Sequence, residues 1–379
     1  MMRKRFPLIS GALAAGAALA APAMVHADQP RIVSSILPIH GLVAGLTEDV
    51  FEAEVLLPPD ASPHGYSMRP SEARRLQRAD VVVWVGPDME TFLESPLRNQ
   101  GEGTTVVTLM EDLELNLLPT RSGGVWEPHS HDHDHDGDGH DDEHGHADDH
   151  GHGHDHDHDH DHGHDNDHAH DHDHGHDHDH GHDHDHDHDH GHGHGHGHGH
   201  DEGHDPEHRD AHIWLSPDNA RAIVEQLADQ LAEHLPEEAS ALEDNRDRML
   251  ERIDALDADL EQRLAPVRDQ AFVVFHDAYQ YFEDHYGLNA AGSITLDPSR
   301  SPGARRISEL RERLADDDVA CLFTEPQFRP ALAETIVEGH ATRLGELDPV
   351  GASLQPGPEA WFQLMDNLAD GFLDCMRRE

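Results

Sequence analysis

The chain has 379 residues and a formal net charge of −52, because 78 Asp and Glu residues outnumber 26 Lys and Arg residues. This length is sufficient for two domains and a long insert. Lys4 is the only lysine and no basic stripe is present, so the composition excludes nucleic acid as a partner.

The N-terminal residues have the pattern of a secretory signal peptide. A basic start (residues 3–5) precedes an apolar, Ala-rich core (8–23) and a small-residue cleavage site that ends at Ala27. This core is too short, and too soon followed by polar sequence, for a stable membrane span. No Cys follows it to carry a lipid anchor. We therefore expect residues 1–27 to be removed and the mature chain to reach the periplasm as a soluble protein.

Strands and helices then alternate. Short β-branched or apolar runs predict strands, and apolar residues spaced three and four apart predict helices. The predicted strands are 31–36, 51–57, 81–85 and 104–109, and the predicted helices are 40–47, 70–79 and 89–97. A loop rich in turn-forming residues leaves the carboxyl end of the second strand and carries His64. This order predicts a mostly parallel sheet.

Residues 129–208 interrupt the pattern with His alternating with Asp or Gly, and 34 of the 42 histidines lie there. Because the segment has few apolar residues, it cannot bury enough surface to offset the entropy lost when its backbone is ordered. We therefore predict a disordered insert. Neutral imidazoles beside carboxylates bind zinc, copper and nickel, which predicts a metal collector. Its accessory ligands would include His131, His133, His135, His154, His156 and His158. The alternatives are a solvated spacer without a role and an artificial tag, which the internal position and the length disfavour.

Regular structure is predicted again after the insert. Ser216 suits an N-cap and Pro217 the first turn of a helix. A second, very polar helix is predicted over 237–264, roughly 40 Å long, as a strut between two halves. Strands are predicted at 272–275, 293–296 and 319–324, and helices after 276 and at 301–315, 330–338 and 359–377.

The fold class expected from these elements is α/β, with two Rossmann-like lobes joined by one long rigid helix. The expected boundaries are a signal peptide (1–27), an N-terminal lobe (28–235, with the insert), a linker helix (236–265) and a C-terminal lobe (266–379).

The chain has only two cysteines, Cys321 in a predicted strand and Cys375 in the last predicted helix. An even count favours a disulfide in an oxidising compartment. Closing a loop of that length would contribute roughly 4 kcal/mol on the chain-entropy model. Two buried free thiols are the alternative.

Three histidines outside the insert share a context. His64, His212 and His276 each lie in a turn or at the end of an element that borders an α/β sheet. Open α/β sheets bind ligands beyond the carboxyl ends of their strands, where Glu325 is also predicted. Three neutral imidazoles with one oxygen, from Glu325 or water, suit tetrahedral Zn²⁺, whereas a Mn²⁺ site uses more carboxylate. Each histidine taken alone is more often a capping or core residue.

Six segments, in order along the chain, carry a family resemblance. They are SILPIHGLV (35–43), HGYSMRPS (64–71), ADVVVWVGPDME (79–90), AHIWLSP (211–217), VFHDAYQYFE (274–283) and TEPQFRP (324–330). They resemble the zinc-specific solute-binding proteins of bacterial ABC importers, the ZnuA-like group, over nearly the whole mature chain. The resemblance implies two lobes joined by a rigid helix, zinc in the cleft between them, a His/Asp-rich loop at the position of the insert, and a disulfide in the second lobe.

Carried over position by position, the resemblance implies three zinc ligands: His64, His212 and His276. The family often has an acidic residue just before the first histidine, where this chain has Pro63. Glu325 or a water molecule is therefore expected as the fourth ligand. Asp277 is expected to orient His276 or its loop, or alternatively to cap a helix. Neighbouring aromatic residues such as Tyr281 are expected to pack.

The function predicted from these features is capture and delivery of zinc without catalysis. A monomer would carry zinc to an ABC membrane permease with a separate cytoplasmic ATPase, because the chain has no P-loop. The insert would be a low-affinity collector or a sensor of excess zinc. The alternatives are manganese import, a periplasmic metal store or chaperone built on the insert, and a zinc hydrolase. Three histidines and a water fit a hydrolase, but the sequence has no HExxH motif.

Overall fold

A computed structural model describes residues 30–101, 103–121, 209–295, 302–316, 318–328 and 330–377. The predicted signal peptide, the insert and its accessory histidines lie outside these ranges. All described residues belong to one compact unit. Within these ranges no helix has the length and apolar character needed to cross a membrane.

The first lobe is built on a parallel sheet with the strand order β2-β1-β3-β4. Its strands are β1 (Ile32–Ser34), β2 (Ala53–Val55), β3 (Val81–Trp84) and β4 (Thr105–Thr108). Its helices are α1 (Leu37–Leu46), α2 (Pro70–Leu76), α3 (Thr91–Arg98) and the short α4 (Leu109–Asp112). Every residue of β3 is buried, as a continuous apolar run in a covered parallel sheet requires. The predicted alternation of strand and helix is confirmed.

The second lobe repeats the plan with the strand order β6-β5-β7-β8, again parallel. Its strands are β5 (Phe272–His276), β6 (Ala290–Thr295), β7 (Cys321–Thr324) and β8 (Arg343–Glu346). Its helices are α7 (Gln280–Tyr286), α8 (Ala304–Asp316), α9 (Ala331–Val337) and α10 (Ala360–Met376).

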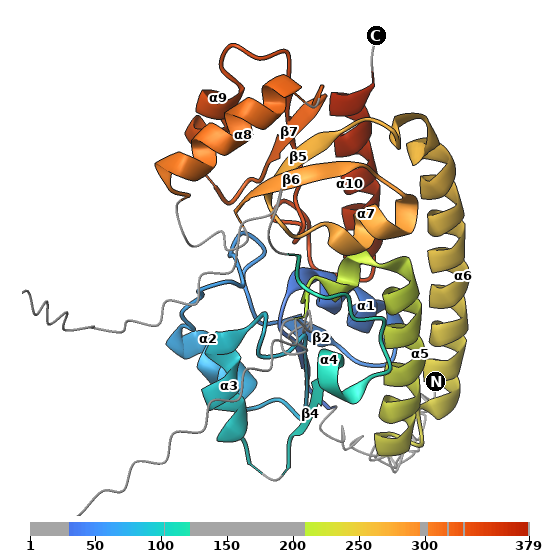
Figure 1. Cartoon of the computed structure of the whole chain (residues 1–379). Coiled ribbons are helices and arrows are strands. Elements are labelled where there is room, and N and C mark those ends of the chain that lie inside the picture. Colours follow the sequence, from blue (N-terminus) through green and yellow to red (C-terminus); the bar gives the residue numbers. More distant parts are fainter. Residues whose placement is uncertain are drawn as a thin grey trace, which may run out of the picture. The chain divides into compact units, whose positions relative to one another are not determined.

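Alternating residues of β5 bury both faces of this second sheet. Val273 and Phe275 join a cluster with apolar residues of α8 and α9. Phe272 points the other way, and its ring lies 5.0 Å from that of Phe372 in α10. Because successive side chains of a strand point to opposite faces, an all-apolar strand needs helices on both sides. Figure 1 shows α8 and α9 on one side of the sheet and α10 on the other.

Two helices connect the lobes. A 3₁₀ turn, η1 (Ile213–Leu215), leads into α5 (Pro217–His234), and α6 (Ala239–Leu264) runs beside α5 (Figure 1) before a second turn, η2 (Ala265–Val267). Ser216 caps α5 as predicted, because its hydroxyl accepts a hydrogen bond from the amide of Asn219. The long polar helix predicted over 237–264 is confirmed as α6, which begins two residues later.

The helices α1, α6 and α10 pack closely together. A methyl group on Gly41 of α1 would lie 2.5 Å from the backbone nitrogen of Trp361 in α10, and one on Gly45 would lie 2.4 Å from the sulfur of Met249 in α6. One hydrophobic core consequently runs from the first sheet to the inner face of the second. The predicted domain boundaries at 235 and 266 thus separate segments that share a core, and they stay a prediction.

A disulfide joins Cys321 in β7 to Cys375 in α10, with the two Cα atoms 6.2 Å apart. The predicted pairing is confirmed. It fixes the last helix to the strand that leads to Glu325.

Candidate metal centre

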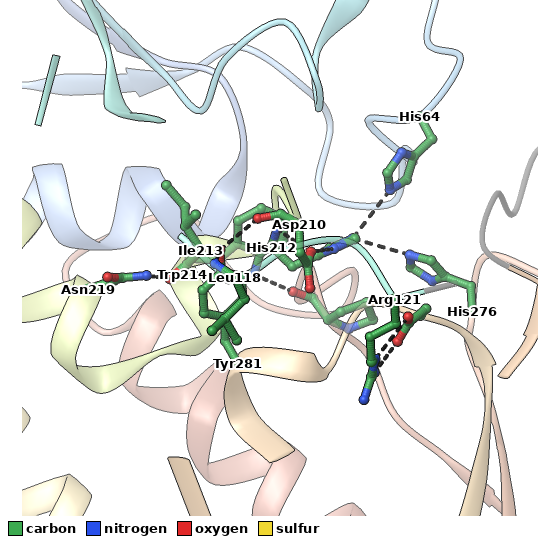
Figure 2. Close-up of polar contacts among 12 residues, drawn as sticks. His64, Leu118, Arg121, Asp210, His212, Ile213, Trp214, Asn219, His276 and Tyr281 are labelled. Carbon is green, nitrogen blue, oxygen red and sulfur yellow. Dashed lines mark hydrogen bonds and ion pairs between the residues drawn. The ribbon is translucent and has the colours of Figure 1, made fainter. Parts of the chain in front are cut away.

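Three histidines from distant parts of the sequence converge on one point. His64 lies in the loop after β2, His212 directly precedes η1, and His276 is the last residue of β5. The Nε2 atom of His212 lies 3.4 Å from Nε2 of His64 and 3.2 Å from Nε2 of His276. Figure 2 shows the three rings turned toward one another. Within the described residues this is the one group of three or more His, Cys, Asp or Glu side chains whose ligand atoms lie within 4.8 Å of one another.

The spacing of these nitrogens matches a tetrahedral zinc site. Zinc binds imidazole nitrogen at about 2.0–2.1 Å, which puts neighbouring ligand atoms of a tetrahedron roughly 3.3 Å apart. The two observed distances, 3.4 and 3.2 Å, bracket this value. The arrangement therefore presents three nitrogens to one ion without any movement of the backbone.

Two carboxylates contact the Nδ1 atoms of two of the rings, opposite the Nε2 atoms that face one another. Nδ1 of His212 lies 2.7 Å from Oδ1 of Asp210, and Nδ1 of His276 lies 2.7 Å from Oε1 of Glu325. An Nδ1–H that donates to a carboxylate leaves the Nε2 lone pair free for a metal, and the hydrogen bond also fixes the plane of the ring.

The two rings differ in their affinity for a proton. Burial, together with the neighbouring His276, lowers the pKa of His212 well below its ordinary value. Burial acts in the same direction on His276, but the charge and hydrogen bond of Glu325 outweigh it and raise the pKa of that ring. The buried Glu325 carboxylate favours a positive charge on the His276 ring, and a metal ion bound at Nε2 supplies that charge in place of a proton. The site is therefore suited to a divalent metal.

Glu325 and Asp277 each make a specific contact beside the histidine cluster. Glu325 follows β7, the neighbour of β5, so its carboxylate reaches the Nδ1 side of His276 and not the side that faces the other two histidines. Asp277 pairs with the guanidinium of Arg121 instead of with His276. Glu325 thus contacts the Nδ1 atom of His276. The expected roles of Glu325 as a fourth ligand and of Asp277 in orienting His276 or its loop stay predictions.

The cavity among the three imidazoles is small. It has a volume of about 10 Å³, room for about one water-sized particle. Residues of both lobes line it, among them Pro63, His64, His212, His276, Glu325 and Phe328. The indole of Trp214 lies beside His212, with ring centroids 5.3 Å apart. Such a site accepts a single ion and excludes a larger solute.

Sequence reasoning missed the roles of three residues around this centre. Asp210 contacts His212, while Arg121 and Tyr281 contact Asp277 and Asp210, which are neighbours of the site. Asp210 also accepts a hydrogen bond from the backbone amide of His212, which is the local turn that Asp forms two residues ahead of its partner. The D-x-H spacing was the available signal, and it was hidden at the end of the His/Asp run. No local sequence pattern indicates the roles of Arg121 and Tyr281, because their partners lie more than 70 residues away in the chain.

The fold and the histidine cluster define a two-lobed α/β protein with a candidate site for one metal ion between its lobes. The profile of one family, ZnuA, described as zinc-uptake complex component A, periplasmic, matches residues 32–375, and the chain belongs to this family. The chain is 40% identical over 351 residues to the high-affinity zinc uptake system protein ZnuA of Brucella suis, covering 93% of both chains. It is 30% identical to the protein of that name from Yersinia pestis over the full length of both.

Solved structures share the fold. A crystal structure of ZnuA superposes with a TM-score of 0.63 at 19% identity and covers 92% of this chain and 100% of its own. The periplasmic zinc binding protein TroA of Treponema pallidum gives a TM-score of 0.65 at 16% identity, with the same coverage. The predicted family and fold class are confirmed.

Proposed function

We propose that this protein captures Zn²⁺ in the periplasm and delivers it to the membrane permease of an ABC importer, as a binding protein without a catalytic role. The observation that carries the proposal is the convergence of three Nε2 atoms at the edge lengths of a zinc tetrahedron. The full-length relatives named high-affinity zinc uptake system proteins support it.

In this proposal His64, His212 and His276 bind the ion. Asp210 and Glu325 orient two of the rings, and a water molecule takes the fourth position, because the Glu325 carboxylate is already bonded to Nδ1 of His276. An exchangeable water leaves one face of the ion open. That open face gives the cargo a way to leave when the protein docks on the permease.

The ligand set, rather than the fold, selects the cargo. A solute-binding protein of the same fold, FpvC of Pseudomonas aeruginosa, has been solved with Mn²⁺, with a TM-score of 0.63 at 18% identity. Imidazole nitrogens favour zinc over manganese, which prefers oxygen. Three nitrogens with no carboxylate facing the ion therefore favour zinc for this chain.

The remaining parts of the chain have roles consistent with this cycle. We assign residues 1–27 to export with cleavage near Ala27, and the energy of transport to a separate cytoplasmic ATPase. The delivering form is a monomer, and the insert at 129–208 is an accessory collector. A ZnuA deletion mutant of the same fold has been solved with zinc bound, so that protein still binds zinc when a segment is deleted.

The test is His64→Ala, because it removes one ligand and leaves the buried hydrogen bonds of the other two histidines intact. Zinc affinity at the tight site is expected to fall by more than roughly 100-fold, beyond the usual effect of losing an orienting partner. Calorimetry measures the affinity, and growth of a strain that depends on this protein under zinc limitation measures delivery. The control is His234→Ala, an exposed histidine on α5.

Undiminished growth and affinity in His64→Ala would overturn the proposal. Loss of affinity without loss of growth would favour a periplasmic store over a transporter component.

A further inference from the structure

The two chain segments that flank the insert are paired with each other. We call residues 117–121 the leading arm and residues 209–212 the trailing arm. Pro119 and Arg209 form an antiparallel bridge, and the amide of Asp210 donates to the carbonyl of Leu118 at 2.9 Å. The arms therefore form one unit at the base of the insert.

One helix of the second lobe holds both arms. The hydroxyl of Tyr281 in α7 accepts a hydrogen bond from the amide of Leu118 at 3.1 Å and donates one to the carbonyl of Asp210 at 2.8 Å. Figure 2 draws Tyr281 together with Leu118 and Asp210, its two partners. A single buried hydroxyl thus ties the two arms to α7.

Arg121, at the end of the leading arm, adds an ionic contact to the same lobe. Its guanidinium donates to both carboxylate oxygens of Asp277 and, at 2.6 Å, to Oε2 of Glu283 in α7. The Arg121 side chain is 18% exposed, and both carboxylate side chains are 4% exposed. A guanidinium that bonds both oxygens of a carboxylate fixes orientation as well as distance.

Each arm is also linked to one of the metal-site histidines, the trailing arm directly and the leading arm through a neighbouring residue. The trailing arm contains His212 and its partner Asp210. The leading arm reaches Asp277, the residue that follows His276. The backbone amide of Asp277 donates to the carbonyl of Thr295 in β6. His212 and His276 are consequently connected through the paired arms, the Arg121 guanidinium and the Asp277 carboxylate.

We propose that Arg121 is a positioning residue for the metal site: by holding Asp277 against the paired arms, it keeps His276 at binding distance from His212. The inference deepens the proposed function and rests on it. Arg121 does not contact the ion in this arrangement. Its loss lets the loop of His276 move relative to the trailing arm, so a tetrahedral site opens without the loss of any ligand.

The test compares Arg121→Ala, Arg121→Lys and a matched control, Arg263→Met. Arg263 also joins distant elements through carboxylates, Asp366 and Asp370 in α10, but none of these is a neighbour of a metal-site histidine. Zinc affinity of Arg121→Ala is expected to fall roughly 10–100-fold, as is usual when an outer partner of a metal ligand is removed. Arg121→Lys keeps the positive charge but cannot bond both oxygens of a carboxylate at once. Its zinc affinity should lie between those of Arg121→Ala and wild type.

Two further readouts separate positioning from general loss of structure. The visible absorption of bound Co²⁺ reports coordination geometry, and its intensity should fall in Arg121→Ala but not in Arg263→Met. Arg121 also lines a solvent-open cavity of about 630 Å³, which gives added guanidinium ion access to the truncated site. Millimolar guanidinium should restore both the zinc affinity and the Co²⁺ spectrum of Arg121→Ala.

Wild-type zinc affinity and an unchanged Co²⁺ spectrum in Arg121→Ala would overturn the inference. So would guanidinium that restores thermal stability and leaves the affinity low. If His64→Ala weakens binding while Arg121→Ala does not, only this inference fails. If neither substitution weakens binding, the proposed function itself fails.

Discussion

Glu325 distinguishes two arrangements of the metal site at the scale of single residues. Its carboxylate is 3% exposed and lies 2.7 Å from Nδ1 of His276, on the far side of the ring from the other histidines. A carboxylate in this position orients a ligand and increases its basicity. A carboxylate in direct contact with the ion would instead add an oxygen to the coordination sphere.

Glu325→Gln tests which role the residue has. The amide retains the volume and a hydrogen-bonding oxygen but loses the charge, so zinc affinity should fall by roughly 10–100-fold. X-ray absorption of the zinc-loaded variant should show the same three nitrogens and one light ligand as the wild type. Loss of an oxygen ligand from the spectrum would identify Glu325 as the fourth ligand and contradict the orienting role.

A second residue-scale prediction concerns His40 in α1, which is 3% exposed. Burial lowers the pKa of His40 from 6.5 to about 4. Between pH 6.5 and pH 4 the imidazole of His40 therefore binds a proton in the unfolded chain but not in the folded protein. The free energy of unfolding is unaffected above pH 6.5 and falls as the pH drops toward 4. The loss reaches roughly 3 kcal/mol below both pKa values.

Urea unfolding of wild type and His40→Leu between pH 7 and pH 4, with a zinc chelator present, isolates this contribution. The variant should lose less stability than wild type across that window. Parallel curves for the two proteins would show that His40 does not carry the acid sensitivity.

The sequence located the three histidines because each stands at a turn or an element end and within a family motif. It did not locate their supports. Asp210 comes just after the His/Asp run, so nothing local separates it from the many acidic residues there, and Arg121 has no feature that separates it from a surface arginine until the fold brings it to Asp277. Residues whose role depends on contacts between distant segments cannot be assigned from local pattern.

At the scale of elements, the disulfide between β7 and α10 is a test of how the second lobe is held together. Its cysteines are 54 residues apart, so the chain-entropy model gives a contribution of roughly 4 kcal/mol. The double substitution Cys321→Ser with Cys375→Ser should lower the free energy of unfolding by about 2–4 kcal/mol, measured by urea denaturation. Zinc affinity should stay within a few-fold of wild type, because neither cysteine contacts the histidines, and a collapse of affinity would contradict this separation.

Element prediction succeeded where apolar periodicity was strong and failed where it was absent. The central strands β3, β5 and β7 and the long α6 follow from their patterns. The strand β8, with sequence RLGE, was missed, because it lies at the edge of its sheet and three of its four residues are exposed. The strand predicted at 293–296 overlaps the end of β6. The strand itself begins at Ala290, and its first three residues, Ala-Ala-Gly, lack the β-branched pattern that predicts a strand.

At the scale of the whole molecule, the continuous core through α1, α6 and α10 makes the two lobes one compact unit. The sequence indicated two lobes and a strut but not this sharing, because the α10 residues that pack on α1 lie some 320 positions along the chain from their partners. This shared core of described residues predicts that the metal site is independent of the insert.

Deleting residues 129–208 tests that independence. The deletion leaves both arms and all three histidines, so calorimetry should show fewer zinc ions bound per protein and one remaining tight site of unchanged affinity. Disappearance of the tight site in the shortened protein would show that the insert is part of the main receptor.

The antiparallel bridge between Pro119 and Arg209 has one more consequence. Because the two backbones already meet at that bridge, the free energy of closing whatever chain lies between them grows only with the logarithm of its length, by about 0.6 kcal/mol per doubling. Natural variation can therefore lengthen or shorten the polyhistidine tract with little thermodynamic penalty. The same property makes this position suitable for grafting a reporter domain whose signal follows metal loading.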